Sequence, residues 1–418
     1  MAEQVSSRVT TTRVPVLVRP TLADMRALVR LAAPVMTVEM GMMSMNVVDT
    51  IFVGHLSSTA LAAVSLALVY YYTVVVIGMG TLVGFDALVS QAVGADDQAA
   101  VRRAIQRGLL LAALLCIPLA LILWPTGPVL RALHQPAEIV PIATRVVHIS
   151  ILGLPGGLAF VVLRQTLQSM ERLRPILLAV VYANIINAAC NWLLINGHLG
   201  APAMGVDGSA FASVIGRTSL PLLLLWMGRD VLWPLLRVRD ALLFELAPLT
   251  RMLRIGLPVG VQYLLEVGVF NAVALLMGMQ ATRTLAAHQV AINLASFTFM
   301  MPLGIGAAAS VLVGQAIGRG DADAARRAAV AALTAGVIAS LATTLLFLAI
   351  PELLASAYVT DREVIALAAT LIPLAGVFQL FDGMQAVAGG ALRGAADTRA
   401  AMIANILGFW AVGLPLGL

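Results

Sequence analysis

The sequence predicts an all-α polytopic membrane protein built as two similar six-helix lobes. Its 418 residues are 60% hydrophobic and only 11% charged, whereas a soluble domain is about half apolar and a quarter charged. Apolar runs of about 20 residues, enough to cross a ~30 Å hydrocarbon layer, recur along its whole length. Residues 251–318 also repeat residues 27–94 without a gap. An internal repeat of this kind dictates the architecture.

The repeat is marked by identical residues at fixed positions. They include Arg254 over Arg30, Pro258 over Pro34, Gly278 over Gly54, Gly304 over Gly80 and Gln315-Ala316 over Gln91-Ala92. An even number of expected helices separates the two copies, so both enter the membrane from the same side. The lobes are then related by a pseudo-twofold axis along the membrane normal, as in transporters with parallel repeats.

The expected helices follow one another in a simple order. After a polar lead over 1–26, the first lobe (27–228) contains six, at about 28–53, 59–90, 106–124, 139–169, 175–196 and 207–228. The polar segment 229–250 connects the lobes. The second lobe (251–418) contains five, at about 253–278, 284–315, 329–350, 363–391 and 400–418. The twelfth helix is missing, and we expect that the chain is truncated.

The arginines predict the orientation. They carry all the positive charge behind the net charge of +5, because the chain has no lysine. Most of them lie in the lead and in the loops after even-numbered helices, for example Arg102, Arg103, Arg326 and Arg327. The positive-inside rule places these loops and the N-terminus in the cytoplasm. We expect a multi-pass protein of the inner (cytoplasmic) membrane. Such an arginine excess reports orientation, so we expect no nucleic-acid partner.

Two acids of the second lobe are the strongest candidates for a functional site. Glu266 lies 12 residues past Arg254, and Asp382 lies 11 residues before Arg393, which places both about 16–18 Å into the membrane. An acid there costs roughly 2.5–3.5 kcal/mol on insertion scales. The expected supporting polar residues are Gln289, Asn293, Gln379 and Gln385. This site suits a proton or a hard cation such as Na⁺, although a polar cluster that only locks helix packing is the alternative.

A third acid, Asp49, lies near the outer end of the first helix. It is 19 residues past Arg30, roughly 28 Å along the helix. Asn187 and Asn191, at i and i+4 on another helix, share a face that can meet it. Asp49 is therefore a candidate cation-coupling residue, with a purely structural role as the alternative.

Other charged residues have simpler explanations. Glu39 and Arg217 lie at mid-depth, where they can pair and neutralise each other, with a role in transport as an equal alternative. Asp86 and Arg164 lie two turns from the cytoplasmic end, where their side chains can reach the interface. The acids of the cytoplasmic linkers at 96–97 and 321–323 are expected to be charges at helix N-termini. A chain without lysine has no P-loop, which excludes an ATP-driven pump contained in one chain.

Several short motifs resemble the MATE (multidrug and toxic compound extrusion) family, in its NorM-like branch. They are Val48-Asp49-Thr50, Leu265-Glu266-Val267, Ala287-His288-Gln289, Phe381-Asp382-Gly383, Ala391-Leu392-Arg393-Gly394 and Gly413-Leu414-Pro415. The resemblance implies that Glu266 and Asp382 are the cation-site acids of the second lobe, and that Asp49 with Asn187 is the site of the first. Phe299 and Phe378 stand where relatives often have tyrosine, which leaves only ring faces for a cation.

The resemblance also implies a function. We expect a monomeric antiporter, not an enzyme, that needs no cofactor and exports cationic organic small molecules across the lipid bilayer in exchange for Na⁺ or H⁺. A flippase for lipid-linked precursors is the alternative within the same fold, and would need a strongly basic cavity. A membrane-embedded transferase is the alternative from another class, and would need a metal-binding acid cluster at a membrane face.

Overall fold

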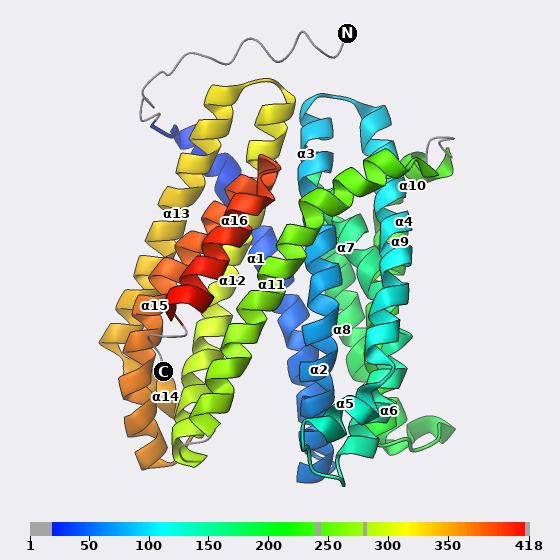
Figure 1. Cartoon of the computed structure of the whole chain (residues 1–418), viewed down its shortest axis with the longest axis vertical. Coiled ribbons are helices and arrows are strands. Elements are labelled where there is room, and N and C mark those ends of the chain that lie inside the picture. Colours follow the sequence, from blue (N-terminus) through cyan, green and yellow to red (C-terminus); the bar gives the residue numbers. More distant parts are fainter. Residues whose placement is uncertain (1–18, 239–243, 279–281, 414–418) are drawn as a thin grey trace.

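A computed structural model of the chain shows an all-helical protein and describes residues 19–238, 244–278 and 282–413 (Figure 1). Within these residues, nine helices are long and apolar enough to cross a membrane, and one bent helix pair adds a tenth span. The polytopic helical architecture predicted from the sequence is confirmed.

The first lobe follows the predicted helices closely. Its elements are α1 (Leu22–Gly54), α2 (Ser58–Val83), α3 (Asp86–Gly94), α4 (Gln98–Leu123), α5 (Thr126–Ala132), α6 (Val140–Ile151), α7 (Leu154–Ser169), α8 (Leu173–Asn196) and α9 (Val206–Met227). The predicted fourth helix is divided into α6 and α7, which meet at 49°. Gly153 lies at this break and Pro155 follows it, and a proline cannot donate the backbone hydrogen bond that would continue α6.

The second lobe starts after a short helix, α10 (Arg229–Arg237), that the sequence analysis did not predict. Its elements are α11 (Leu246–Gly278), α12 (Thr282–Gly318), α13 (Ala322–Ala349), α14 (Pro351–Ser356), α15 (Arg362–Gly394), α16 (Thr398–Asn405) and a π-helical stretch at Ile406–Gly413. Figure 1 shows the two bundles side by side, with α11 running diagonally across the front.

The two copies of the repeat begin their third helices in the same way. The Asp97 carboxylate accepts a hydrogen bond from the Ala100 backbone N–H, and the equivalent Asp321 accepts one from Ala324, both at 2.8 Å. Side-chain oxygens at this position satisfy N–H groups that the helix leaves unpaired. The predicted helix-terminal role of Asp97 and Asp321 is therefore confirmed.

The lobes meet mainly along three helix pairs, α2 with α11, α3 with α12 and α1 with α12. The first and the third are related by the repeat. In the first pair, an added Cβ on Gly84 would lie 2.6 Å from the Gly256 Cα, and one on Gly80 would lie 2.7 Å from the Gly260 Cα. Small residues four apart allow this close approach of helix backbones in membranes. The repeat predicts the third contact from the first, and an added Cβ on Gly304 would indeed lie 2.3 Å from Met36.

Candidate functional site

The structure brings the two predicted acids of the second lobe together. Glu266 on α11 and Asp382 on α15 lie within electrostatic range of each other. Asp382 is only 8% exposed, and its Oδ1 has no hydrogen-bond partner among the residues that the structure describes. A buried carboxylate oxygen without a donor is costly when ionised. The pair is therefore able to bind a proton or a small cation that neutralises it.

Asn405 on α16 is a third member of this site that the sequence analysis did not assign to it. Its side chain lies against Glu266 and is 1% exposed. Neither amide atom has a hydrogen-bond partner within the described parts of the chain. A buried amide is normally hydrogen-bonded, so Asn405 offers a free oxygen ligand beside the two acids. The available signal was a polar side chain within an apolar, membrane-spanning stretch of the second lobe.

Gln379 lies one turn before Asp382 and fastens α15 to α12. Its Nε2 donates to the Ala295 carbonyl at 2.7 Å, and its Oε1 accepts from the Thr298 hydroxyl at 2.9 Å. Both polar ends of the amide are thus engaged by α12. Gln379 supports the site by holding the helix that carries Asp382, and it offers no free ligand in this arrangement.

Among the residues that the structure describes, the remaining predicted polar side chains form no hydrogen bond with either acid. Gln289 and Asn293 are both exposed on α12, and the Asn293 amide donates to the Gln289 carbonyl at 2.9 Å. Gln385 is half-buried on α15, one turn after Asp382. Their supporting role stays a prediction.

Aromatic side chains gather beside the second-lobe site. The Phe378 ring is 43% exposed, and its centroid lies 6.2 Å from those of both Phe270 and Phe409. These rings come from α15, α11 and the π-helical stretch. Phe299 is half-buried on α12. Exposed ring faces of this kind attract organic cations, which fits the predicted aromatic role of Phe378.

Asp49 lies in the interior of the first lobe, where its carboxylate is fully coordinated. Oδ1 accepts hydrogen bonds from the Asn187 and Asn191 amides at 2.9 and 2.7 Å, and Oδ2 accepts one from the Ser213 hydroxyl at 2.5 Å. Asp49 is 4% exposed and both asparagines are 0% exposed. The predicted contact of Asp49 with the two asparagines is present, and Ser213 is an additional donor.

The expected pair of Glu39 with Arg217 is wrong. Glu39 on α1 forms its ion pair with Arg164 on α7 instead. The Arg217 guanidinium lies 5.0 and 5.3 Å from the ring centroids of Tyr71 and Tyr72, and donates to the Tyr72 hydroxyl at 3.0 Å. Depth alone suggested the pairing, whereas the long Arg217 side chain on α9 reaches two aromatic rings of α2.

Asp86 also differs from the expectation that it reaches the membrane interface. It is 1% exposed at the start of α3, and its Oδ1 accepts hydrogen bonds from Ser90 at 3.1 Å and Ser169 at 2.9 Å. The second lobe covers this position, which a reading of one helix at a time cannot reveal. Arg164 is likewise engaged inside the protein, by Glu39.

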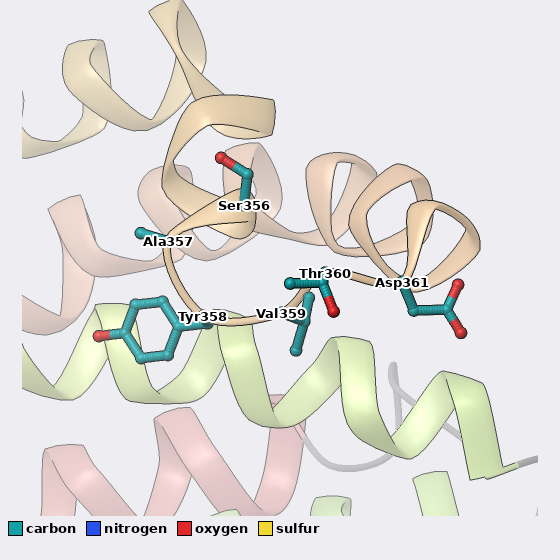
Figure 2. Close-up of a pocket in the computed structure, with 6 residues that line it drawn as sticks. All are labelled: Ser356, Ala357, Tyr358, Val359, Thr360 and Asp361. Atoms are coloured by element: carbon teal, nitrogen blue, oxygen red, sulfur yellow. The ribbon is translucent and has the colours of Figure 1, made fainter.

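A surface depression in the turn between α14 and α15 is unrelated to these acids. It is lined by the consecutive residues Ser356–Asp361, which Figure 2 shows along a single turn. Asp361 caps the start of α15, and Asp382 follows 21 residues later in the same helix, roughly 30 Å away. The depression is a local feature of the turn.

Comparison with known proteins identifies the family. The sequence pattern of the MatE family matches residues 34–193 and again residues 258–418. This chain belongs to the MatE family. The two matches correspond to the two lobes of the internal repeat, and the resemblance noted in the sequence is confirmed.

Curated relatives extend over almost the whole chain. One is the "Probable multidrug resistance protein NorM" of Rhizobium meliloti (strain 1021), 35% identical over 93% of this chain and 85% of its own length. The "Multidrug resistance protein NorM" of Vibrio vulnificus (strain YJ016) is 32% identical over 94% of this chain and 86% of its own length.

Solved structures share the fold. The eukaryotic MATE transporter AtDTX14 matches with a TM-score of 0.86 at 22% identity, over 94% of this chain and 88% of its own. An outward-facing multidrug resistance MATE family transporter of the MOP superfamily matches with a TM-score of 0.84 at 18% identity, over the same shares of the two chains. The chain is thus a multi-pass membrane protein with the two-lobed MATE architecture.

Proposed function

We propose that this protein is a cation-coupled multidrug antiporter of the NorM type. It exports cationic, amphipathic organic compounds in exchange for Na⁺ or H⁺, by alternating access of a site between the lobes. It lies in the inner membrane with the arginine-rich loops in the cytoplasm, and it works as a monomer. The names of its relatives as multidrug resistance proteins support the substrate class.

One observation supports the coupling most directly, namely the unpartnered Oδ1 of Asp382 beside Glu266. Two ionised carboxylates in one buried site repel each other, and burial deprives both of water. A proton or Na⁺ from outside removes this penalty. The free energy of loading is then available to bias one arrangement of the lobes over the other.

The drug and the coupling ion compete for the negative charge of Glu266 and Asp382, and this competition couples their movements in opposite directions. When Glu266 and Asp382 are unloaded, they attract a cationic compound from the cytoplasmic side, and the rings around Phe378 bind its apolar part. When the coupling ion loads the acids from outside, this attraction is lost. The effect is reciprocal: if binding of the ion weakens binding of the drug, then binding of the drug weakens binding of the ion by the same factor.

The coupling ion is Na⁺ or H⁺. The two carboxylates and the free Asn405 oxygen provide oxygen ligands of the kind that hard cations prefer. Phe299 and Phe378 provide no hydroxyl oxygens, so the oxygen ligands that lie together in the structure are those of Glu266, Asp382 and Asn405. That limited number of oxygens leaves the proton as a full alternative to Na⁺.

The flippase alternative has less support, because the buried positive charges of the first lobe are balanced. Arg164 is paired with Glu39, and Arg217 lies in the field of Asp49. An anionic lipid precursor would need unbalanced arginines in a central cavity. We therefore favour cationic compounds as the cargo.

The test is efflux of a fluorescent cation from proteoliposomes under an imposed Na⁺ or H⁺ gradient. Wild type is compared with Glu266→Gln and Asp382→Asn, which keep the shape of each side chain and remove its charge. Glu352→Gln is the matched control, because Glu352 is an exposed acid of the same lobe. Gradient-driven export is expected in wild type and control and lost in both site variants. Export at the wild-type rate by either site variant would remove that residue from the coupling site.

A further inference from the structure

The lobes are joined at their arginine-rich end by two hydrogen bonds that the repeat relates to each other. The Gln91 amide on α3 donates to the Gly394 carbonyl at the end of α15, at 3.0 Å. The Gln315 amide on α12 donates to the Ser169 carbonyl at the end of α7, at 2.9 Å. Gln91 and Gln315 occupy equivalent positions of the two copies. Each lobe therefore binds the other with the same residue.

The two acceptors are equivalent as well. Ser169 and Gly394 each end a helix, and a residue with positive φ follows two positions later, Glu171 at 58° and Ala396 at 61°. Such ends leave backbone carbonyls without partners in their own helix. The glutamine of the opposite lobe supplies the missing donor in both cases.

Glycines three residues after the glutamines bring the backbones close enough for these bonds. An added Cβ on Gly94 would lie 2.0 Å from the Gln315 carbonyl oxygen, and one on Gly318 would lie 2.0 Å from the Gln91 carbonyl oxygen. Each glutamine thus donates through its side chain to one helix of the other lobe and packs its backbone against a glycine of another. The contact requires both lobes to be closed at this end.

A buried acid of the first lobe lies at the same contact. Asp86, one turn before Ser90 on α3, lies in the field of Arg393 from the second lobe. The Ser90 Cβ would lie 2.6 Å from a Cβ added to Gly314, so the helices around Asp86 are in direct contact. Separation of the lobes would move Asp86 and Arg393 apart and expose both to water.

We propose that Gln91 and Gln315 form a reciprocal clasp that keeps the arginine-rich end of the transporter closed and must open when the drug site faces that side. The clasp rests on the alternating access proposed above. In the open state water replaces each of these hydrogen bonds. Each glutamine therefore stabilises the closed state only by the small net free energy of one hydrogen bond. Loss of one glutamine should raise the ratio of open to closed protein about fivefold, and loss of both about 25-fold.

The test measures the distance between the lobes directly, by electron–electron resonance of two spin labels. The labels are placed at Gln98→Cys and Ala322→Cys, the exposed first residues of α4 and α13, after Cys116 and Cys190 are changed to serine. The variants Gln91→Met, Gln315→Met and their combination keep the side-chain volume without the amide. Gln135→Met is the matched control, because the Gln135 amide donates only within its own loop.

The expected result is a larger long-distance population in each clasp variant, largest in the double variant, with the control unchanged. If a Met variant fails to fold, Gln→Asn at the same position gives the same shift, because the shorter amide cannot reach its acceptor. An unchanged distance distribution in the double variant would overturn the clasp, provided that a bound fluorescent cation still changes the distance. If the distance responds to neither the variants nor the cation, the lobes do not separate, and alternating access itself is wrong.

Discussion

Asp49 in the first lobe and Asp382 in the second lobe are both buried aspartates, but their oxygens have opposite surroundings. Three side chains, Asn187, Asn191 and Ser213, donate hydrogen bonds to Asp49. Asp382 has an oxygen without a donor and a second acid, Glu266, in electrostatic range. The lobes share a scaffold through the repeat, so the difference comes from the side chains alone.

The difference indicates which acid requires a bound proton or cation. Hydrogen bonds from neutral donors compensate a buried carboxylate, and charged groups gain roughly 1.5–3 kcal/mol from each. In this conformation three donors surround the Asp49 carboxylate, so a coupling role for Asp49 would require these donors to move away. Asp382 Oδ1 lacks such a donor, so a proton or cation is the group that completes the site it forms with Glu266. The comparison predicts structural effects from changes at Asp49 and functional effects from changes at Asp382.

The largest effect on stability is expected from Asp49→Ala. The change leaves two buried amides and a hydroxyl without their acceptor, and each unsatisfied group costs about 1–3 kcal/mol. We expect the free energy of unfolding to fall by about 3–5 kcal/mol, measured by SDS-induced unfolding in mixed micelles. Asp207→Ala is the control, because its pair with Arg145 is partly exposed and such pairs contribute at most about 1 kcal/mol. Equal stability of the two variants would contradict the comparison.

Asp382→Asn should have the reverse profile. Removal of an unpartnered buried charge leaves the free energy of unfolding unchanged or higher. Gradient-driven export should fall about 100-fold, since a neutral site no longer distinguishes a loaded from an unloaded state and shifts no equilibrium. Efflux from proteoliposomes and SDS unfolding are measured on the same preparation. Loss of stability as large as that of Asp49→Ala would show that Asp382 is structural.

Asn405→Ala should weaken binding of the coupling ion without abolishing export. The variant removes one neutral oxygen ligand and keeps both acids, so the concentration of Na⁺ or H⁺ that gives half-maximal export should rise about tenfold, or ~1.4 kcal/mol. The control is Asn271→Ala, which removes an exposed asparagine of the same lobe. An unchanged ion dependence would exclude Asn405 from the site.

Asn405 also shows where prediction from the sequence ends. The repeat, the apolar runs and the arginines predicted two lobes and the order of the membrane helices, because these depend on lengths and periodicities within the chain. The short helices α5, α10 and α14 were missed, since they lie outside apolar runs. The break between α6 and α7 was also missed, although Pro155 marked it.

Contacts between helices were predicted only where depth and helix face agreed. Asn187 and Asn191 were placed beside Asp49 because their spacing fixes one face. Depth without a face gave the wrong partner for Glu39, which binds Arg164. Asp86 was misplaced because nothing in its own helix shows that α12 covers it. The orphan atoms of Asp382 and Asn405 follow from packing alone, so no sequence pattern could predict them.

The smallest effect distinguishes the individual donors around Asp49. Ser213→Ala removes the 2.5 Å bond to Oδ2 and leaves both asparagine bonds to Oδ1. We expect a loss of about 1–2 kcal/mol in the free energy of unfolding, with gradient-driven export unchanged. Ser219→Ala on the same helix is the matched control, because that hydroxyl bonds only to the Gly216 carbonyl of its own helix. If Ser213→Ala instead alters the ion dependence of export while stability holds, then Asp49 takes part in coupling, and the division between a structural and a functional acid fails.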